Sequence, residues 1–586
     1  FMPRIRNYAD PEKCRAAGRI RILFAAAVVL ILLLSGRLFY IQVFCHEEFS
    51  KAAVSQYGIP VKGLDTRGQI FDRNGEALTG NHYEYYYIIS KDRVDRRLTE
   101  MKEKGLLTDI TRSSEVYRIY RSDTYDRSLA QTLKDDYEAY VFRLQSRYEK
   151  NQTAAHLIGY LNEAEEKGVS GLELFCEDKL KVSGSYLSVW ADAAGKILPG
   201  IPPQIMQADQ SIMASKSVIT TLDKELQETC EKLLAQTGVN GACIISECTS
   251  GEILVMASAP GFDPTRLEHY MTNAVSDAEK DCLVNKAIQG TYPPGSVFKL
   301  VTAAAALENG VCDIGQKFCC EGEVTVEGIT VKCSTAPEGG HGELGMTEAM
   351  AKSCNCYFAK LGEKTGYKDI LQMAEKLGMG NCCLPGFPGE SAGNLPAVSE
   401  SADCDITNLS IGQGKLLATP LQINQITATI GTGGLKTEMQ ILKDNSIGTT
   451  GGNGQFRGLE TGEYDDGMLS GREGERILSE ETAEKLQEVM RAVMTEGTGS
   501  HISWDRPVWG KSGTAETVWG SEYIKNCWFT GFFDVESDKK TGSTLPNASG
   551  QNVKRYAVTV LLEKGISGSA SALPVFHGIF AYLSNN

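Results

Sequence analysis

A long apolar run, residues 22–44, lies near the N-terminus. Its only strongly polar residues are Arg37 and Gln42. It is long enough to cross a bilayer. The basic residues before it predict that residues 1–21 lie in the cytoplasm and that the rest of the chain lies outside. A cleaved signal peptide is the alternative, but no small-x-small cleavage site follows the run. We therefore expect a single-pass, uncleaved membrane anchor.

A second apolar run, Leu300–Leu307, is bounded by residues that stop helices. Two prolines and a glycine at 293–295 block a helix up to this point, and Asn309-Gly310 ends the run. The run therefore predicts a buried helix. Ser296 lies at or near the N-terminus of this helix, and Lys299 follows one turn later on the same face.

Apolar patterns in the second half of the chain predict further helices and strands. The expected helices are 224–234, 347–353 capped by Thr347, 357–361, one that starts at Thr419-Pro420, 480–494 and 573–583. The expected strands are 242–246, 252–257, 507–517, 526–535 and 555–562. Consecutive strands joined by loops favour an antiparallel sheet with the buried helix behind it. The pattern predicts an α/β (α+β) domain.

The first half of the chain carries fewer clear signals. Residues 91–155 are charge-rich with helical periodicity. Asn74-Gly75 between apolar residues predicts a hairpin turn, and the Arg and Asp residues beside it could form an ion-paired strut. Residues 436–475 are glycine-rich and polar, which is typical of an exposed insertion. We expect an elongated N-terminal domain over residues 45–215 and a second domain over residues 216–586.

Composition narrows the classes of function. The chain has 586 residues and a formal net charge of −15, so it can form more than one domain and is a poor partner for nucleic acid. It contains no GxxxxGK[ST], no GxGxxG after a strand and no HExxH motif. Nucleotide-binding and zinc-protease functions are therefore disfavoured.

The chain has 17 cysteines, an odd and high number. Some lie close together in the sequence, namely Cys319-Cys320 with Cys333, Cys354 with Cys356, and Cys382-Cys383. Metal binding and disulfides are alternatives, but no paired C-x2-C set with finger spacing occurs. We expect mostly free, buried thiols, and we predict neither a metal nor a cofactor.

Ser296 and Lys299 have the chemistry of an acyl-transfer site. The free N–H groups and the positive dipole end at a helix N-terminus stabilise a nucleophile or an oxyanion. A lysine on the face of a buried helix is partly desolvated, which favours its neutral, proton-accepting form. A second Ser-x-x-Lys match, Ser537 to Lys540, lies in a polar stretch with no helix to hold it.

Acyl transfer also needs a proton relay, an oxyanion hole and a clamp on the substrate. Ser353 and Asn355, at the start of a helix, could supply the relay hydroxyl and an amide that orients the substrate. The edge strand expected at 507–517 offers a cation, two hydroxyls for a carboxylate, and a glycine that lets a substrate backbone approach: Lys511, Ser512, Thr514 and Gly513.

Three motifs in this order, Ser-x-x-Lys, Ser-x-Asn and Lys-[Ser/Thr]-Gly, resemble the signature of penicillin-binding proteins and serine β-lactamases. They stand at Ser296–Lys299, Ser353–Asn355 and Lys511–Gly513. The likeness extends over nearly the whole chain to class B penicillin-binding proteins, the membrane-anchored, monofunctional D,D-transpeptidases that cross-link peptidoglycan. The other stretches that carry it are Arg67–Gly75, Gly171–Glu173, Pro294–Ser296, His341-Gly342, Gly412–Gly414 and Thr419-Pro420.

This resemblance implies a transpeptidase fold with a five-stranded antiparallel sheet flanked by helices, and an elongated N-terminal pedestal. It implies that Lys299 takes the proton of Ser296, which attacks the carbonyl between two terminal D-alanines. Ser353 would pass the proton to the departing D-alanine, whose carboxylate lies on the 511–514 strand. The backbone N–H groups of Ser296 and Thr514 would hold the oxyanion. The charge of Lys511 should lower the pKa of Lys299.

The partners implied by the resemblance are stem peptides on lipid-linked nascent glycan, β-lactam antibiotics, the membrane and a glycan polymerase of the SEDS type. A serine β-lactamase is one alternative, because Glu390 and Asn394 have the Glu-x-x-x-Asn spacing of class A β-lactamases. A membrane anchor and a long first domain argue against it. A β-lactam sensor is another alternative, but it would need several membrane spans and an intracellular effector.

Overall fold

The computed structural model describes sixteen stretches of the chain: residues 11–43, 58–61, 67–111, 116–162, 167–181, 186–190, 204–206, 216–271, 276–397, 405–443, 449–450, 456–457, 474–519, 522–536, 545–546 and 552–585. Contacts divide the chain into two compact units. The first comprises Phe1–Leu64, Tyr85–Phe142 and Ser185–Met206, and the second comprises Asp65–Glu84, Arg143–Gly184 and Gln207–Asn586.

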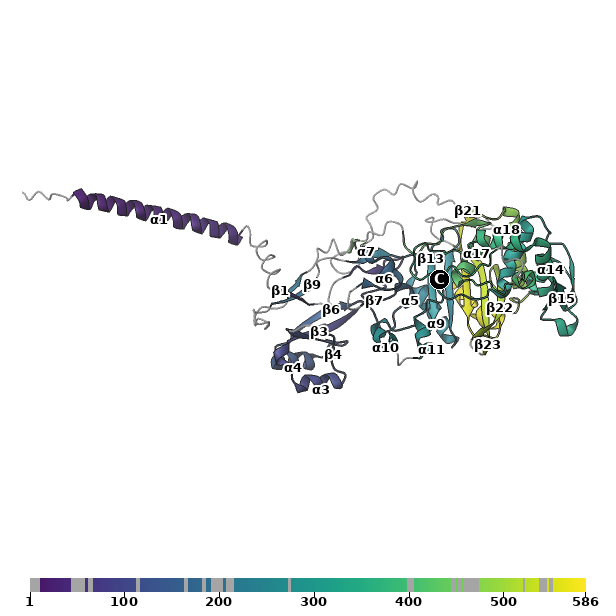
Figure 1. Cartoon of the computed structure of the whole chain (residues 1–586), viewed down its shortest axis with the longest axis horizontal. Helices are drawn as coiled ribbons and strands as arrows, with labels where there is room; N and C mark the ends of the chain where they lie inside the picture. Colours follow the sequence, from purple (N-terminus) through teal and green to yellow (C-terminus); the bar gives the residue numbers. More distant parts are fainter. Residues whose placement is uncertain are drawn as a thin grey trace, which may run out of the picture. The chain divides into compact units, whose positions relative to one another are not determined.

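The N-terminal apolar run forms helix α1, Pro11–Val43, coloured purple in Figure 1. Within it, Phe24–Val43 has a mean hydropathy of 2.2 and is not buried by other parts of the protein. Among the described residues, α1 is the one helix long and apolar enough to cross a membrane. The predicted apolar helix is therefore present, and it begins eleven residues before the apolar run.

The first unit holds most of a four-stranded sheet of order β4-β5-β3-β6, in which the start of β3 and the end of β6 are counted with the second unit. Its strands and helices are β3 (His82–Ser90), β4 (Thr108–Asp109), β5 (Tyr117–Ser122), β6 (Tyr140–Ser146), η1 (Lys91–Arg93), α3 (Arg96–Glu103) and α4 (Arg127–Tyr137). A smaller sheet joins β1 (Gly58–Val61), β9 (Tyr186–Trp190) and β10 (Gln204–Met206).

The helical periodicity expected over residues 91–155 is correct for α4 but wrong for two segments that form strands. In β5, Tyr117 and Ile119 are buried and Arg118 between them is not, which is the period of a strand. In β6 the exposure also alternates from residue to residue. Aromatic and β-branched side chains suit a pleated sheet, and tertiary packing decided between the two periods here.

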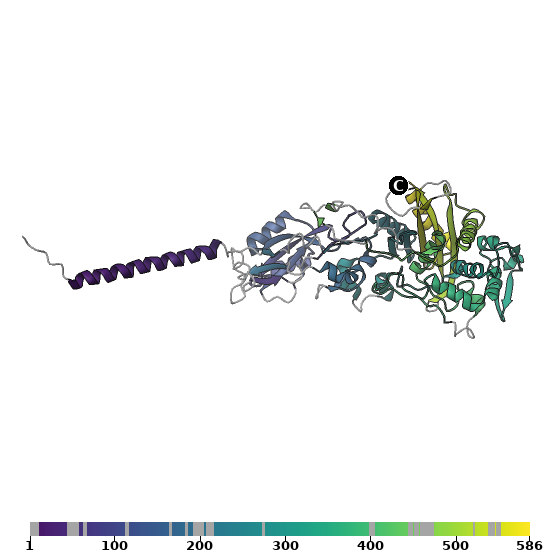
Figure 2. The same cartoon turned by 90° about the horizontal axis from the view of Figure 1, so that it is seen from above.

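The second unit contains the predicted antiparallel sheet. Its five strands are β12 (Gly241–Glu247), β13 (Ile253–Ala259), β22 (Val508–Trp519), β23 (Glu522–Glu536) and β25 (Asn552–Leu562). They lie in the order β13-β12-β25-β23-β22, and every pair is antiparallel. A two-residue strand, β24 (Leu545–Pro546), pairs with one end of β25. Figures 1 and 2 show the sheet in yellow and teal, with β22 at one edge.

Helices cover both faces of this sheet, as predicted. On one face Thr427 of α17 (Pro420–Gly431) lies 2.6 Å from Thr530, hydroxyl to hydroxyl. On the other face Phe576 of α19 (Leu573–Asn585) packs against Phe529, with ring centroids 4.7 Å apart. Phe529 and Thr530 are neighbours in β23 and therefore point to opposite faces. Helix α9 (Lys224–Gln236) also packs on the sheet, beside α19.

The remaining elements of the second unit surround the sheet. They are β2 (Ile70–Phe71), α5 (Ala155–Ile158), β7 (Leu161–Asn162), β8 (Lys167–Gly168), α6 (Gly171–Phe175), α7 (Glu177–Leu180), β11 (Val218–Ile219), η2 (Pro264–Arg266), α10 (Leu267–Met271), α11 (Asp277–Lys280), η3 (Asp281–Leu283), η4 (Gly295–Phe298), α12 (Lys299–Glu308), β14 (Phe318–Cys320), β15 (Glu323–Val326), β16 (Ile329–Lys332), η5 (Ala336–Glu338), β17 (Gly342–Leu344), α13 (Met346–Ala351), α14 (Asn355–Thr365), α15 (Tyr367–Lys376), α16 (Ile406–Leu409), β18 (Leu435–Lys436), β19 (Thr449–Thr450), β20 (Phe456–Arg457), β21 (Glu475–Arg476), α18 (Glu480–Thr495) and η7 (Gly568–Ala572).

Two local predictions are corrected by these elements. Thr347 does not cap its helix, because α13 begins one residue earlier and its N-cap is Gly345, whose N–H donates to Glu348 at 2.6 Å. Asp72 does not pair with an arginine beside the turn at Asn74, since its carboxylate accepts backbone N–H groups of the turn itself. Most of the insertion expected at 436–475 lies outside the described residues.

Arg67 instead belongs to a buried ion cluster in the second unit. Its guanidinium donates to Glu173 at 2.6 Å and to Glu177 at 2.7 Å. Glu173 has no exposed surface, and it also accepts from Arg147 at 2.6 Å and from the Tyr148 hydroxyl at 3.1 Å. Each buried charge in this cluster thus has an opposite charge beside it.

Candidate active site

The predicted nucleophile lies in a tight turn that leads into the buried helix. Ser296 is part of the 3₁₀ turn η4, and Lys299 is the first residue of α12. Residues three apart eclipse one another in a 3₁₀ turn, so Ser296 and Lys299 share a face. Gly295 has a φ of +55°, which favours glycine, and its N–H donates to Gly412 O at 2.8 Å. Ser296 is half-buried, and its hydroxyl has no hydrogen-bond partner among the described residues.

Four predicted site residues meet directly through hydrogen bonds. The Lys299 ammonium donates to Ser353 Oγ at 3.2 Å and to Asn355 Oδ1 at 2.8 Å. It also donates to the Ser353 carbonyl oxygen at 2.8 Å. Lys511 Nζ donates to Ser353 Oγ at 3.0 Å. The Ser353 hydroxyl therefore lies between two lysines that are more than two hundred residues apart in the sequence.

A strained residue places the Ser353 hydroxyl at this junction. Ser353 follows α13 with a φ of +52°, a left-handed conformation that costs energy for a residue other than glycine. The next residue, Cys354, is the N-cap of α14, and its N–H donates to Ala349 O at 2.8 Å. The side-chain amide of Asn355 donates to Lys332 O at 2.9 Å, which leaves Asn355 Oδ1 directed at Lys299.

The third motif reaches the site because β22 packs tightly against η4. A Cβ atom on Gly513 would lie 3.0 Å from a methyl group of Val297 and 3.2 Å from Pro294 O. Glycine at this position therefore allows the edge strand β22 to approach η4, the turn that carries Ser296. The sequence also predicts that Gly513 makes room for a substrate backbone, and the close approach to η4 is a second reason for glycine here. Lys511 is fully buried, and Ser512 and Thr514 stand on either side of Gly513 in the strand.

Two contacts hold the hydroxyls of this strand. Ser512 Oγ lies 2.8 Å from Thr498 Oγ1, and Thr514 Oγ1 accepts the Gly568 N–H at 3.1 Å. No motif in the sequence points to Thr498 as a site residue. The only signal for it was its place in Gly497-Thr498-Gly499 after a helix, which gives no hint of a contact with Ser512.

The two lysines of the site are buried, and among the residues that the structure describes neither has an acidic side chain beside it. Burial lowers the pKa of Lys299 to about 8, although nearby cysteines act in the opposite direction. Burial, and then the charge of Lys299, lower the pKa of Lys511 well below its ordinary value. Two ammonium groups that share one hydroxyl repel each other, so the site favours the loss of a proton from this pair.

A network of buried hydrogen bonds holds the residues that precede η4, the turn that carries Ser296. The Tyr292 hydroxyl donates to Glu563 Oε1 at 2.7 Å, and Lys286 lies 3.2 Å from the same oxygen. Trp528 Nε1 donates to Pro293 O at 3.0 Å. These contacts hold Tyr292 and Pro293, two of the three residues that lead into Gly295 and Ser296. The network joins positions that no sequence motif connects.

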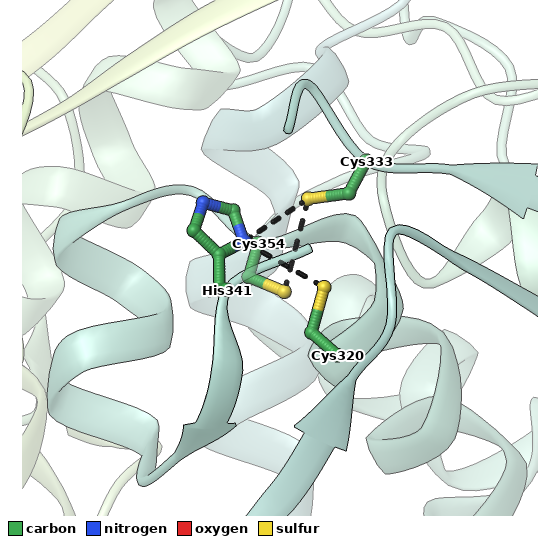
Figure 3. Close-up of side chains that lie close together, drawn as sticks. All are labelled: Cys320, Cys333, His341 and Cys354. Carbon is green, nitrogen blue, oxygen red and sulfur yellow. Dashed lines mark hydrogen bonds between the residues drawn. The ribbon is translucent and has the colours of Figure 1, made fainter. Parts of the chain in front are cut away.

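The residues of the second unit also include one cluster with the composition of a metal site. Cys320, Cys333, His341 and Cys354 place one ligand atom each within 4.8 Å of one another. In the sequence these cysteines fall into separate groups, no motif links His341 to them, and we predict no metal, whereas the structure brings the four side chains together (Figure 3). Cys354 is the middle residue of the Ser353–Asn355 motif, so this cluster adjoins the site.

Comparison with known proteins identifies the family. Residues 241–563 match the family described as the penicillin binding protein transpeptidase domain. This match covers more than half of the chain, and the chain belongs to the penicillin-binding protein transpeptidase family. Its similarity to class B, monofunctional members confirms the resemblance seen in the motifs.

The proteins similar to this chain include two named relatives and two with solved structures. The peptidoglycan D,D-transpeptidase MrdA of Acinetobacter baumannii is 28% identical over 86% of this chain and 80% of its own length. Stage V sporulation protein D of Bacillus subtilis is 25% identical over 87% of this chain and 78% of its own.

Among solved structures, one chain of a peptidoglycan synthase complex is 25% identical, with a TM-score of 0.63 over 97% of this chain and 98% of its own. The penicillin-binding protein PBP2 of Helicobacter pylori, solved in complex with MreC, is 20% identical. Its TM-score is 0.62 over 89% of this chain and 97% of its own. Both agree with the observed fold.

Proposed function

We propose that the protein is a peptidoglycan D,D-transpeptidase that works through an acyl-enzyme on Ser296. The observation that carries this proposal is the junction at Ser353, where Lys299, Asn355 and Lys511 converge from three distant segments. The names of its relatives support the same reaction, since one is a peptidoglycan D,D-transpeptidase. We propose that residues 216–586 carry the chemistry, with residues 65–84 and 143–184 packed into the same unit.

Acylation begins with the transfer of the Ser296 proton to neutral Lys299. The serine oxygen then attacks the carbonyl carbon between the two terminal D-alanines of a stem peptide. The negative charge that develops on the carbonyl oxygen is held by the backbone N–H groups of Ser296 and Thr514. As the peptide bond breaks, Ser353 gives its proton to the departing D-alanine nitrogen and regains one from Lys299. The hydrogen bond between Lys299 and Ser353 supports this route.

The substrate carboxylate completes the charge balance of the site. In the free protein Lys511 has a lowered pKa and no acidic partner among the described residues. A carboxylate beside Ser512 and Thr514 supplies the missing negative charge, so its binding raises the pKa of Lys511 and protonates it. A charged Lys511 then favours the neutral, basic form of Lys299. Substrate binding thereby prepares the general base.

An amine from a neighbouring stem peptide attacks the acyl-enzyme, forms the cross-link and frees Ser296. A β-lactam would acylate Ser296 by the same route, because its carboxylate and its strained amide resemble the D-alanyl end. When a β-lactam ring opens, the leaving nitrogen stays bonded to the acyl group. It therefore does not leave the site, and the adduct persists. We propose that β-lactams are covalent inhibitors of this protein.

The structure offers little support for the β-lactamase alternative. Glu390 would have to activate water, but its two carboxylate oxygens accept the N–H groups of Cys383 and Leu384 at 2.7 and 2.9 Å. The side chain of Asn394 donates to Lys415 O. Both residues of the Glu-x-x-x-Asn match thus hold loop backbone.

We also propose that α1 anchors the protein in the cytoplasmic membrane, with residues 1–21 inside and the catalytic unit outside. The apolar segment Phe24–Val43 and the basic residues before it support this topology. A glycan polymerase of the SEDS type is the expected partner. The similarity to a chain of a peptidoglycan synthase complex supports such an association.

Labelling with a fluorescent penicillin tests the proposed function. The full-length protein in detergent should form a stoichiometric adduct, and mass spectrometry should place it on Ser296. Ser296→Ala should remove the label while leaving the melting temperature unchanged, and Ser276→Ala, at an exposed serine of the same unit, should label normally. Retained labelling of the Ser296→Ala protein would exclude Ser296 as the nucleophile. Catalytic turnover of nitrocefin, instead of one stoichiometric burst, would favour the β-lactamase alternative.

A further inference from the structure

The second unit contains a cavity that none of the three motifs lines. It lies where the segments around α5 and α6 meet the stretch of chain between β13 and η4. The space inside is about 340 Å³, counting the part that opens to solvent, which suits one small chemical group. The wall includes aromatic rings and polar side chains, among them Tyr160, Phe262, Phe387, His156, Ser170 and Gln289.

The wall of this cavity carries no charge. None of the described residues that line it is an Asp, Glu, Lys or Arg. His156 is neutral at physiological pH, because burial lowers the pKa of its imidazole to about 4. A carboxylate, a phosphate or an ammonium group would lose its hydration here without gaining an opposite charge. The cavity therefore fits a neutral group.

His156 gives the cavity a hydrogen-bond acceptor. Its Nε2 lies 2.7 Å from the carbonyl oxygen of Cys282. A carbonyl oxygen can only accept, so Nε2 carries the proton and Nδ1 of the neutral ring keeps its lone pair. Nδ1 has no hydrogen-bond partner among the residues that the structure describes. It is therefore free to accept an N–H or O–H from a ligand.

Gln289 gives the cavity a donor. Its Oε1 accepts the backbone N–H of Asn285 at 2.8 Å, which fixes the amide and leaves Nε2 as the group to donate. Gly389 makes room for this amide, since a Cβ atom there would lie 2.5 Å from Nε2. Ser170 is the N-cap of α6 but makes no capping hydrogen bond with its side chain, so its hydroxyl is a second donor.

The remaining wall is apolar and rigidly packed. The rings of His156 and Phe262 meet edge to face, with centroids 5.1 Å apart, and those of Tyr160 and Phe262 do so at 6.2 Å. Phe387, on the same cavity, packs against Phe175 with ring centroids 5.2 Å apart. Phe175 is 38% exposed, so a flat apolar surface lies beside the cavity and faces solvent.

An acceptor, a donor and an apolar wall together match a methylated secondary amide. The amide N–H of such a group can donate to His156 Nδ1, its carbonyl oxygen can accept from Gln289 Nε2, and its methyl group can pack against Phe262. A hydrocarbon would leave the buried lone pair of His156 without a partner, which costs free energy. A lone hydroxyl would leave the aromatic wall unfilled.

We propose that this cavity binds the N-acetyl group of an amino sugar within a glycan strand, and that the sugar ring lies against Phe175. Identifying that strand as peptidoglycan rests on the proposed function. Gln289 precedes Tyr292 by three residues in the chain that leads to Ser296. The cavity would thus hold the glycan by a segment continuous with the one that carries the nucleophile.

Two tetrasaccharides test the class of ligand. Tetra-N-acetylchitotetraose and cellotetraose share a β-1,4-linked backbone and differ at C2, where the first has an acetamido group and the second a hydroxyl. Full-length protein, in a detergent without a sugar head group, should transfer NMR saturation to the first, most strongly to its acetamido methyl protons. Cellotetraose should bind at least about tenfold more weakly. Equal binding of the two, or no binding of the first, would overturn the proposal.

Gln289→Glu tests the place of binding. Glutamate keeps the oxygen that accepts from Asn285, replaces the donor Nε2 by an oxygen and sets a negative charge beside the acetyl carbonyl. We expect the affinity for tetra-N-acetylchitotetraose to fall at least about tenfold with the melting temperature retained. Gln236→Glu is the matched control, because Gln236 is exposed in the same unit and does not line the cavity. Wild-type affinity in Gln289→Glu would refute the assignment.

Acylation separates the cavity from the active site. Wild-type protein already acylated by penicillin should bind tetra-N-acetylchitotetraose with unchanged affinity. Loss of binding after acylation would place the saccharide at Ser296 and overturn the proposal. Penicillin labelling without saccharide binding would refute the cavity alone, whereas saccharide binding without labelling would count against the proposed function. The two failures are therefore distinguishable.

Discussion

Two groups of buried cations in the second unit differ in how their charge is balanced. Arg67 and Arg147 each lie 2.6 Å from a carboxylate oxygen of Glu173. Lys299 and Lys511 are completely buried, yet among the described residues neither has an acidic side chain within ion-pair distance. Although burial acts to lower the pKa of Arg67, Glu173 and Glu177 raise it overall, whereas the pKa values of both lysines are lowered.

This difference separates a structural role from a chemical one. A buried cation beside a carboxylate stays charged at any physiological pH and ties segments together. A buried lysine without a carboxylate can lose its proton near neutral pH and can therefore accept another. In the proposed mechanism, the negative charge that balances the two lysines is supplied by the carboxylate of the substrate. The predictions below test this contrast, from the largest expected effect to the smallest.

Replacing Lys299 by Met should remove the general base and little else. We expect the acylation rate with a fluorescent penicillin to fall by at least about a hundredfold. The melting temperature should hold or rise, because Met fills a similar volume and carries no buried charge. Stopped-flow or gel-based acylation and thermal melting of the same preparation check both parts. An unchanged acylation rate would mean that another group takes the Ser296 proton.

Replacing Glu173 by Gln should lower the stability and leave the acylation rate nearly unchanged, the opposite of Lys299→Met. The change leaves Arg67 and Arg147 with fewer negative partners in a buried place, so we expect a loss of about 3 kcal/mol in the free energy of unfolding. Folded protein should still be acylated at nearly the wild-type rate. Denaturant unfolding and acylation at low temperature measure the two quantities. If acylation fell hundredfold with no loss of stability, the contrast between the two groups would be wrong.

The acylation rate should depend on pH through Lys299, whose pKa is lowered to about 8. The base acts when neutral, and its neutral fraction falls tenfold for each pH unit below the pKa. The rate should therefore rise from about pH 6 to about pH 8 and level off above. Rate constants across this range, with a β-lactam that does not titrate there, check the profile. A rate that fell with rising pH would require the charged form of Lys299.

Replacing Tyr292 by Phe should have the smallest effect. Tyr292 loses its hydrogen bond to Glu563, but Glu563 keeps Lys286 at 3.2 Å. We expect a loss of about 1 kcal/mol in stability and a decrease of only a few-fold in acylation, since the nucleophile turn keeps its contact with Trp528. Thermal melting and acylation kinetics test this. A loss as large as that of Lys299→Met would give Tyr292 a part in the chemistry.

Local patterns predicted most of the second unit. The apolar run at 300–307, the capped helix at Thr419-Pro420 and the strands of the sheet all occur as expected. The ordered motifs also predicted which residues meet at Ser353. These features succeed because their signals are local, such as a proline stop, a cap or a strand period.

Features that depend on distant pairing were missed. The aromatic residues of 117–120 fit a helix as well as a strand until the neighbouring strands are known. The contact of Thr498 with Ser512 and the gathering of His341 with three cysteines arise only when separate loops fold together. The spacings between those residues follow no regular period, so the sequence alone gives no reason to combine them.

The second unit draws on three stretches of sequence, and this arrangement limits how the enzyme can be shortened. Strand β11 pairs in parallel with β2, and the main-chain oxygen of Lys216 approaches Gly68 too closely for any side chain there. A fragment that starts at residue 216 would lack β2 and would uncover Val218, which is now buried. A soluble catalytic fragment must therefore retain residues 65–84 and 143–184 together with residues 207–586. The residues that can be removed are those of the first unit, Phe1–Leu64 with the apolar helix α1, Tyr85–Phe142 and Ser185–Met206.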